Sequence, residues 1–223
     1  MPEDTDWKLY GPFSDKTLIR EYLAHRLSAS MPNYTPNMVF LELFLVTDQV
    51  LLSSAWDSLE NLREGDVWPY YQGIYILEET IKVAPNRLNI HLASIDITGG
   101  YILSFDSLRN DSIPIEGIPD GHLVLHEPNN PTPDELQYIT NLIDSLENIL
   151  HSASYADPIL GYNSLLDATS FMDQIILNEF TNKVDAYILS TYFYKDKQGV
   201  LKGGPLYDMS FTWVSISSNQ VTR

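Results

Sequence analysis

The sequence predicts an α+β chain in which strands dominate the first part and helices dominate the second. Apolar runs rich in β-branched and aromatic residues, such as Met38 to Val46, occur in the first part. Apolar residues recur at helical spacing after Thr132. Between them, Glu127 to Pro131 (EPNNP) disfavours regular structure and marks a boundary. We therefore expect a β-rich part at 1–126, with an N-terminal helix, and a mainly helical part at 127–223.

Length and charge limit the partners that the chain can have. Its 223 residues, of which 44% are hydrophobic, are enough for one large domain or two small lobes with a real core. Thirteen basic residues against thirty acidic ones give a formal charge of −17. Such a charge argues against nucleic acid and anionic membranes, because no basic surface is present to displace counterions. A bound nucleotide would need a local group of cations or a metal ion.

Cysteine is absent, which excludes disulfides, thiolate nucleophiles and zinc–thiolate sites. No apolar run is long enough to span a membrane, and the N-terminus, MPEDTDW, is acidic where a signal peptide would be basic. We expect no transmembrane segment, and compartment and oligomeric state stay open. The abrupt end at Arg223 suggests a fragment of a longer protein.

The first expected element is a helix from Ser14 to about Ala29. Asp15 and Arg20 are its notable polar residues, and without further information they are an N-cap and a solvated helix charge. Its apolar face is marked by Leu18, Ile19, Tyr22, Leu23 and Leu27.

Two strands follow this helix. Met38 to Val46 is almost continuously apolar, which predicts a buried strand. Residues 47–70 are charged and loop-like, and we expect a surface insertion with one short helix. Gly73 to Lys82 is the next strand, with Glu79 and Lys82 near its end. A lysine at a strand end is a candidate phosphate contact, although a solvated strand end is more common.

Gly99 and Gly100 precede the apolar run Tyr101 to Leu103. Paired glycines form a turn or let the backbone approach a ligand closely, and both interpretations stay open. Residues 106–121 look irregular, and His122 to Leu125 is predicted to be a short strand. The five histidines are scattered, and the pair His122 and His126 is interpreted as ordinary strand and loop residues.

The strongest helix signal begins at Thr132, which serves as the N-cap. Pro133 occupies the first helical position and Glu135 completes a capping box. The face that this helix must bury contains Leu136, Ile139, Ile143, Leu146 and Leu150. A second helix is expected from about Thr169 to Asn182, with core contacts at Phe171, Ile175, Leu177 and Phe180.

The stretch from Asn182 to Met209 predicts a β-hairpin: Ile188 to Tyr194, a polar turn at Lys195 to Gly199, then Val200 to Leu206. Asp185 lies 12 residues before the turn centre and Asp208 lies 11 residues after it, so the two arms bring their carboxylates together. A converging Asp pair beside Asn182 suits phosphoryl transfer, in which one carboxylate accepts a hydroxyl proton and the other holds magnesium. The alternative is a hairpin with solvated acidic residues at its ends.

Seven phrases occur in one order along the chain: DWKLYGPFSDKTLIREYLAHRL, VFLELFL, YQGIYILEETIKVAPNRLNI, TGGYILSFD, EPNNPTPDELQYI, FMDQIILNEFTNKVDAYILSTYFYKDKQG and GPLYDM. In wording and order they resemble the CotH-type protein kinases of spore coats, which are also found on some fungal surfaces. The phrases cover most of the chain from Asp6 to Asp208. The resemblance implies an atypical, kinase-like two-lobed fold, with ATP between a small β-rich lobe and a mainly helical lobe.

The resemblance also implies roles for individual residues. Asp185 resembles the catalytic Asp of the family's N-x-D element. Asp208 resembles the first Asp of its W-D-x-D element, which binds magnesium, and we assign Asn182 to the metal beside it. The strand that carries Glu79 would lie under the nucleotide.

Lys82 is the expected phosphate contact, with Arg20 and Arg87 behind it. The chain departs from the family pattern at Tyr207 and Ser210, where W-D-x-D reads YDMS, and at Ser104, where glutamate is frequent. The fifteen residues after Asp208 carry no family phrase, which suggests a truncated helical lobe.

The leading hypothesis is ATP- and Mg²⁺-dependent phosphoryl transfer to Ser or Thr hydroxyls of a surface or coat protein. The alternative from another class is a catalytically inactive, kinase-like surface or adhesion module. A third is an acidic α+β domain with an unrelated ligand. The resemblance favours a secreted, spore-coat or cell-surface location.

Overall fold

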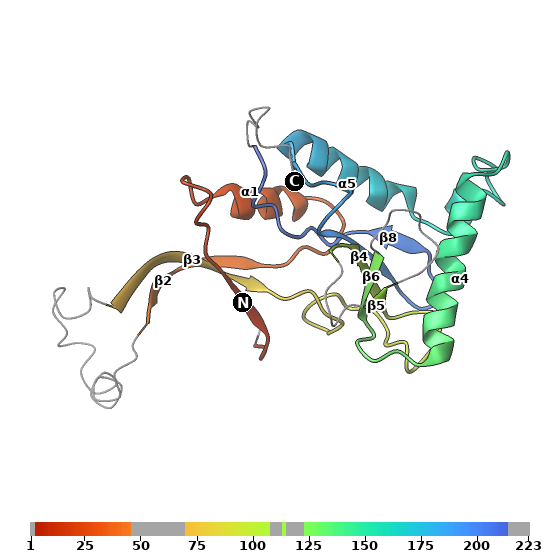
Figure 1. The fold of residues 1–223 in the computed structure, drawn as a ribbon, viewed down its shortest axis with the longest axis horizontal. Coiled ribbons are helices and arrows are strands. Elements are labelled where there is room, and N and C mark those ends of the chain that lie inside the picture. The colour runs from red at the N-terminus through yellow and green to blue at the C-terminus, as the bar shows by residue number, and fades with distance from the viewer. Residues whose placement is uncertain (1–2, 46–69, 108–112, 115–122, 214–223) are drawn as a thin grey trace.

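The structure is a computed structural model that describes residues 3–45, 70–107, 113–114 and 123–213 (Figure 1). Within these residues the chain is mixed α+β, with two antiparallel sheets and three α-helices. The α+β class is therefore confirmed. The insertion expected at 47–70 lies, except for Tyr70, outside the described residues.

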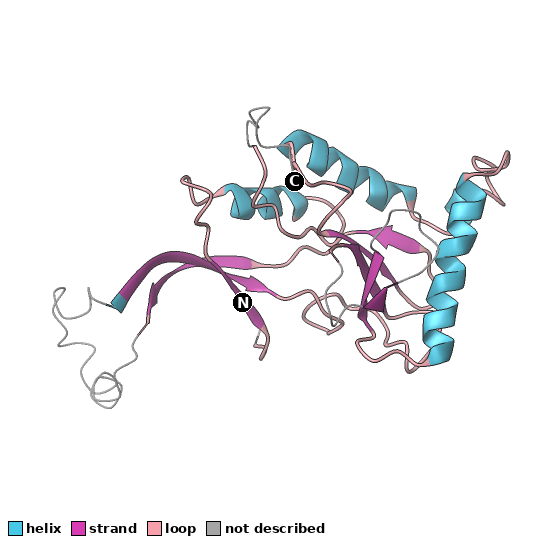
Figure 2. Cartoon of the chain, in the orientation of Figure 1, coloured by secondary structure: helices cyan, strands magenta, loops and turns pink. Residues whose placement is uncertain are grey.

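The first sheet has three strands in the order β1-β3-β2 and extends away from the rest of the chain (Figure 2). Its members are β1 (Trp7–Tyr10), β2 (Met38–Phe44) and β3 (Tyr71–Glu79). The prediction that β2 is buried is wrong, because β2 is an edge strand that leaves Val39, Phe40 and Phe44 exposed. β3 ends at Glu79, so Lys82 lies beyond the strand that we expected it to close.

The second sheet has five strands in the order β5-β6-β4-β7-β8. These are β4 (Tyr101–Phe105), β5 (Ile113–Pro114), β6 (Leu123–Glu127), β7 (Thr191–Lys195) and β8 (Leu201–Gly203). The predicted hairpin is confirmed, because β7 pairs antiparallel with β8. β4 pairs with β7, so strands from both sides of Glu127–Pro131 share one sheet. The division of the chain into lobes at 126/127 stays a prediction.

The helix α4 (Pro133–Leu150) begins with the predicted capping box of Thr132 and Glu135. It packs on the five-stranded sheet, where its Ile139, Ile143 and Leu146 join the main hydrophobic core. The last residue of the expected face, Leu150, is exposed. After a short 3-10 turn at Tyr162–Ser164, the chain enters α5 (Ala168–Thr181), close to the predicted bounds.

The helix α1 (Arg20–Ser28) begins later than predicted. Leu18 has a left-handed φ of +64°, which is incompatible with a helix that continues through it. The Asp15 carboxylate accepts hydrogen bonds from the backbone N–H groups of Thr17 and Arg20, both at 2.9 Å, so it organises the turn before the helix. The predicted apolar face is only partly correct, since Leu27 packs against a hydrophobic core. Ile19 and Leu23 are exposed, whereas Glu21 and His25 are buried.

A second hydrophobic core, which we call the α1–α5 core, contains Ala24, Leu177, Leu206 and Met209. It joins α1 and α5 to the chain that follows β8. Of the core contacts predicted for α5, Leu177 is buried and Phe171 packs against the main core. The contacts predicted for Ile175 and Phe180 are wrong, because both side chains are exposed.

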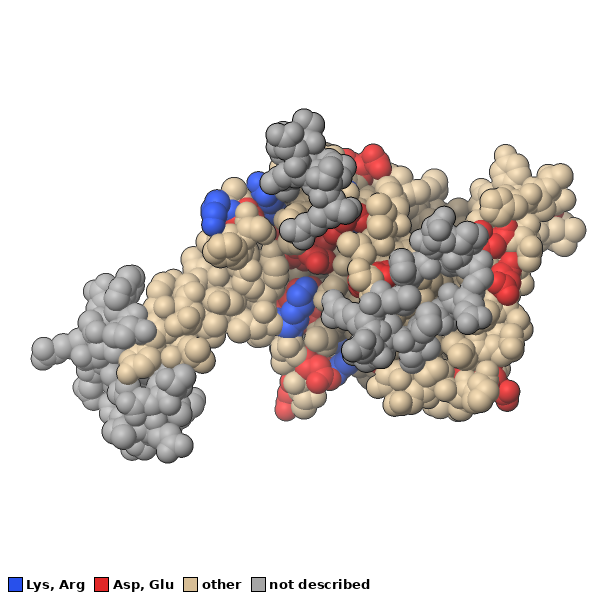
Figure 3. Space-filling view, viewed as in Figure 1, with Lys and Arg blue, Asp and Glu red and all other residues tan. Residues whose placement is uncertain are grey.

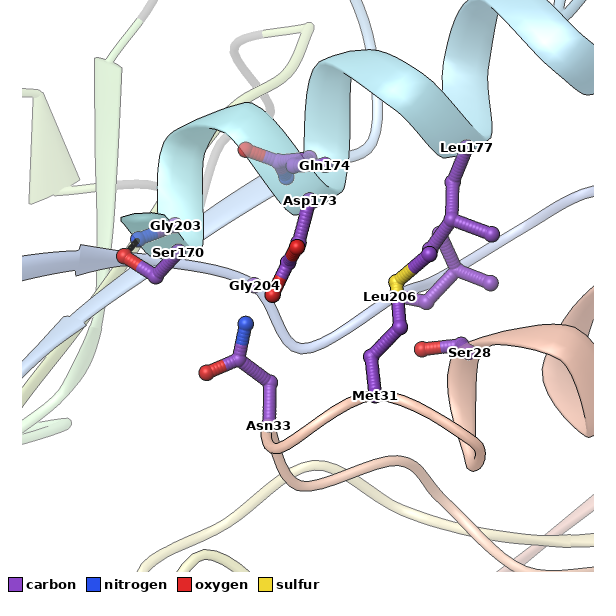
Figure 4. A pocket seen from close by; sticks show the side chains of 10 residues that line it. All are labelled: Ser28, Met31, Asn33, Ser170, Asp173, Gln174, Leu177, Gly203, Gly204 and Leu206. Atoms are coloured by element: carbon purple, nitrogen blue, oxygen red, sulfur yellow. Dashed lines mark hydrogen bonds between the residues drawn. The ribbon is translucent and has the colours of Figure 1, made fainter. Parts of the chain in front are cut away.

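A small pocket lies between the chain after α1, the helix α5 and the chain after β8 (Figure 4). Asn33 and Asp173 point toward each other across it in Figure 4. Its volume of about 20 Å³ is room for about one water molecule, so it does not serve as a ligand site.

Gly99 and Gly100 pack tightly against the protein's own backbone. A Cβ at Gly99 would lie 2.1 Å from the backbone N of Lys197, in the turn between β7 and β8. Gly100 has a φ of +86°, which favours glycine. The backbone at Gly99 therefore lies against the hairpin turn of the protein itself.

Candidate functional site

Lys183 ties together the two arms of the hairpin. Its buried ammonium donates hydrogen bonds to the backbone carbonyls of Ser190 (3.3 Å) and Tyr207 (3.1 Å), one on each arm. Burial lowers the pKa of Lys183, while the Asp185 and Asp208 carboxylates act to raise it. Two acids thus act on one buried cation. Lys183 was not among the predicted site residues, although it lies between Asn182 and Asp185.

Asp185 stands in the turn that connects α5 to β7. Asn182 ends α5 in the left-handed conformation, with φ 49° and ψ 53°, and so redirects the chain toward it. Asp185 is half-buried, and its Oδ1 is a buried atom that makes no hydrogen bond. Burial raises the pKa of Asp185, Lys183 lowers it, and Asp208 raises it further. The carboxylate therefore has an acceptor atom that is not used within the described part of the chain.

Along the chain, Asp208 lies between two residues of the α1–α5 core, Leu206 and Met209. Its own φ is +45°, a conformation that costs about 1 kcal/mol or more for a residue other than glycine. The Ser210 hydroxyl donates a hydrogen bond to Asp208 Oδ1 at 2.5 Å. The residue that stands where the resemblance places a second carboxylate therefore contacts the first carboxylate directly.

The residues predicted to contact ATP form a different network. Lys82 Nζ lies 2.7 Å from Asp4 Oδ1 and 2.5 Å from Asp6 Oδ2. Arg87 Nη1 lies 3.0 Å from Glu79 Oε1, and Arg87 Nη2 lies 3.4 Å from Asp4 Oδ2. These contacts tie the N-terminal segment to the end of β3. In the part of the chain that the structure describes, no hydrogen bond or ion pair joins them to Asp185 or Asp208.

Glu79 is fully buried and also accepts hydrogen bonds from Tyr34 and Asn37. Arg20 lies at the start of α1, where its Nε is 3.5 Å from Asp15 Oδ1. Ser104 is buried, and its hydroxyl is 2.7 Å from Nε2 of His126. The nucleotide-contact roles of Lys82, Glu79, Arg20 and Arg87 and the metal role of Asn182 stay predictions.

A second group of charged side chains, missed by the sequence analysis, approaches Asp208 from the first sheet and α1. Lys8 Nζ forms an ion pair with Glu78 Oε2 at 2.9 Å and lies 4.2 Å from the centre of the Tyr207 ring. Burial and the neighbouring Glu78 raise the pKa of Glu21 to about 8, and Asp208 also raises it. The only sign of this group in the sequence is that charged residues interrupt the apolar residues of these strands and of α1. Figure 3 shows acidic side chains directly beside basic ones in the middle of one face.

A mixed α+β chain in which one buried lysine joins the two hairpin arms that carry Asp185 and Asp208 is consistent with a small kinase-like domain. The chain belongs to the CotH kinase family, because the family model described as CotH kinase protein matches residues 1–223. This confirms the resemblance and indicates kinase-like activity. A search of the curated proteins finds no match. No helix in the described ranges is long and apolar enough to cross a membrane.

Proposed function

We propose that this protein transfers the γ-phosphoryl group of ATP to Ser or Thr hydroxyls of a surface or coat protein, with Mg²⁺ as the metal. The observation that carries the proposal is that Lys183 joins the two hairpin arms that carry Asp185 and Asp208, in a chain of the CotH kinase family. We also propose that residues 1–126 and 127–223 act as two lobes around the nucleotide.

The residues at the site fit magnesium, which prefers oxygen ligands. Asp208 would supply a carboxylate oxygen, and the unpaired Oδ1 of Asp185 lies in the same electrostatic environment. Asn182 is a further candidate ligand through its side-chain oxygen. When bound, Mg²⁺ supplies neutralisation of the charge on the phosphate oxygens.

Asp185 would accept the proton of the acceptor hydroxyl while the oxygen of that hydroxyl forms a bond to the γ-phosphorus. The bond from that phosphorus to the bridging oxygen breaks, and ADP leaves. A carboxylate with a raised pKa is a stronger base wherever it is ionised, so burial of Asp185 favours this role. Lys183 opposes the rise of this pKa and thus helps to keep Asp185 ionised at neutral pH.

Lys8 is a candidate phosphate contact in addition to Lys82, Arg20 and Arg87. Its ammonium lies over the ring of Tyr207, which directly precedes Asp208. To bind a phosphate, Lys82 would have to give up its ion pairs with Asp4 and Asp6. Lys8 would have to contact the phosphate while it keeps its ion pair with Glu78.

The test is transfer of labelled phosphate from ATP to a Ser/Thr-rich protein in the presence of Mg²⁺. We expect Asp185→Asn to reduce the rate by about 100-fold or more, since general bases contribute about 10²–10⁴-fold. Asp208→Asn should also reduce it strongly. Asp144→Asn, on the exposed side of α4, is the matched control and should leave the rate unchanged. Equal rates for wild type and Asp185→Asn would overturn the assignment of Asp185.

One observation favours the alternative of an inactive surface or adhesion module. Ser210 stands where the resemblance places a carboxylate, and its hydroxyl donates a hydrogen bond to one of the two carboxylate oxygens of Asp208, Oδ1. A thermal-shift titration with ATP and Mg²⁺ separates the two functions, because a ligand that binds only the folded state must raise the melting temperature. The absence of a shift at millimolar ATP would favour the adhesion module.

A further inference from the structure

The helix α1 turns a polar face toward the interior. Glu21 and His25, one helical turn apart, are 2% and 3% exposed, and they face Glu78 of β3, which is 0% exposed. The ligating atoms of these three side chains all lie within 4.8 Å of one another. Two buried carboxylates and an imidazole therefore share one small space.

Most of the polar atoms in this space make no hydrogen bond. Both carboxylate oxygens of Glu21, Oε1 of Glu78 and Nε2 of His25 are buried and without a hydrogen-bond partner. The backbone carbonyl of Leu206 raises the pKa of His25 and the backbone N–H of Met209 lowers that of Glu21, but neither contact has the geometry of a hydrogen bond. Each such group costs about 1–3 kcal/mol when it is left unsatisfied. Their convergence on one point suggests that a ligand satisfies them together.

The hydrogen bond of the imidazole prepares it to bind a metal. His25 Nδ1 is 3.0 Å from the backbone carbonyl of Glu21, and a carbonyl only accepts, so Nδ1 carries the proton. The lone pair of the neutral ring is then on Nε2, which faces Glu78 Oε1 at 3.8 Å. Metal-binding histidines usually donate their other N–H to a carbonyl or carboxylate in this way. Donors bound to one ion at about 2.1 Å lie about 3–4 Å apart, which includes this distance.

The charge balance also favours a cation. Lys8 forms an ion pair with Oε2 of Glu78, 2.9 Å away, and so orients that carboxylate. With both carboxylates ionised, the site would carry one more negative charge than Lys8 neutralises, and a bound cation would balance it. Buried charges of this kind are usually paired or bound to a metal.

We propose that Glu21, His25 and Glu78 form a binding site for a divalent transition-metal ion, Zn²⁺ or Mn²⁺. Two carboxylates with one imidazole suit these ions, whereas Mg²⁺ and Ca²⁺ prefer sites made of oxygen alone. The site shares no residue with the magnesium position proposed at Asp208, although Asp208 is near enough to raise the pKa of Glu21, and it does not require nucleotide. It places a metal between α1 and β3, where it fixes the position of both elements.

The test is metal binding by the whole protein after dialysis against EDTA. Titration with Zn²⁺, Mn²⁺ and Mg²⁺ should show one equivalent of Zn²⁺ or Mn²⁺ and a raised melting temperature, with a much weaker response to Mg²⁺. Glu21→Gln and Glu78→Gln should each weaken binding by about tenfold or more. The proposal would be overturned if the protein bound none of the three ions. It would also be overturned if wild type and both variants bound the metal with equal affinity.

The chain offers a matched control on the surface of α4. Glu147 and His151 have the same spacing as Glu21 and His25, but they are exposed, with His151 Nε2 at 3.5 Å from Glu147 Oε2. His151→Gln should leave the affinity unchanged, and loss of binding in this variant alone would overturn the proposal. If the buried variants fail to fold, NMR of wild type decides. Zn²⁺ must shift the Nε2 resonance of His25, and an unchanged resonance would again overturn it.

Discussion

Among single residues, Ser210 has the most direct contact with the proposed chemistry. Its hydroxyl donates a hydrogen bond to Asp208 Oδ1, and it stands where the resemblance to the family places a second acidic residue. We expect Ser210→Asp to lower the melting temperature in EDTA, because a second carboxylate beside Asp208 is repelled without a cation. In Mg²⁺ the same variant should gain more stability than wild type does.

Differential scanning fluorimetry with and without Mg²⁺ measures both effects. Ser210→Asn is the control, since it has a similar shape and no charge, and its response to Mg²⁺ should not exceed that of wild type. The same Mg²⁺ response from the Asp and Asn variants would show that residue 210 does not act on a metal.

The second prediction for a single residue concerns Lys82 and the pH dependence of stability. The hydrogen bond from Lys82 is the main cause that lowers the pKa of Asp4 from 3.8 to about 2. A lowered folded-state pKa stabilises the protein above the unfolded pKa, and this contribution is lost as the pH falls through the folded value. Lys82→Met should therefore destabilise the protein more at pH 6 than at pH 3, and should raise the pKa of Asp4.

An NMR titration of the Asp4 carboxyl and denaturant unfolding at both pH values provide the measurements. Lys202→Met removes an exposed lysine that lies 3.9 Å from Asp167, and it should leave the pKa of Asp4 unchanged. If Lys82→Met also left this pKa unchanged, Lys82 would not hold the N-terminal segment in solution.

The expected convergence of Asp185 and Asp208 depends on their distance from one turn, which can be counted along the chain, and their site roles stay predictions. The sequence could not predict Glu21 and His25 as a buried group, because their burial depends on the rotation of α1 about its axis. The exposed Ile19 and Leu23 show that tertiary contacts override the apolar pattern of this short helix. Lys183 was missed because its hydrogen-bond partners are backbone carbonyls, which no residue type reveals.

At the scale of the elements, Gly99 connects the start of β4 to the turn of the hairpin. A side chain there would meet backbone atoms of Lys197 at 2.1 and 2.4 Å, which cannot move aside easily. We expect Gly99→Ala to lower the free energy of unfolding by about 1–3 kcal/mol, as overpacking does. Denaturant unfolding measures this difference.

Gly199, in the same turn, provides the control. The nearest atom to a Cβ at Gly199 is the carbonyl oxygen of Asp196, at an ordinary 3.4 Å, so Gly199→Ala should be tolerated. Equal losses in the two alanine variants would mean that backbone freedom, and not the contact with Lys197, explains the glycine at position 99.

The start of a helix could be predicted where its sequence signal lies within a few consecutive residues. The cap of α4 lies within four consecutive residues of the sequence, from Thr132 to Glu135, and its start was predicted correctly. The start of α1 was not, because the left-handed Leu18 and the hydrogen bonds of Asp15 to Thr17 and Arg20 give no periodic pattern. Among the described strands, β2 pairs only with β3 and is therefore an edge strand. The number of strands that pair with β2 cannot be read from its composition.

At the scale of the whole molecule, the pairing of β4 with β7 connects distant parts of the chain. Leu103 pairs with Phe193, so strands before and after Glu127–Pro131 share the main hydrophobic core with α4. The α+β class was predictable from local periodicity, whereas this pairing was not, because proline and asparagine mark a break in regular structure and not a limit to the contacts of a sheet.

The main core and the α1–α5 core allow stability and chemistry to be separated in one experiment. Met209 is fully buried in the α1–α5 core and directly follows Asp208 in the sequence. Leu146, a residue of α4, lies in the main core. Met209→Ala and Leu146→Ala should each lower the free energy of unfolding by about 2–5 kcal/mol. Only Met209→Ala should also reduce the thermal shift caused by ATP and Mg²⁺, because it releases the left-handed backbone of Asp208. Equal losses of this shift in both variants would show that the α1–α5 core does not position Asp208 specifically.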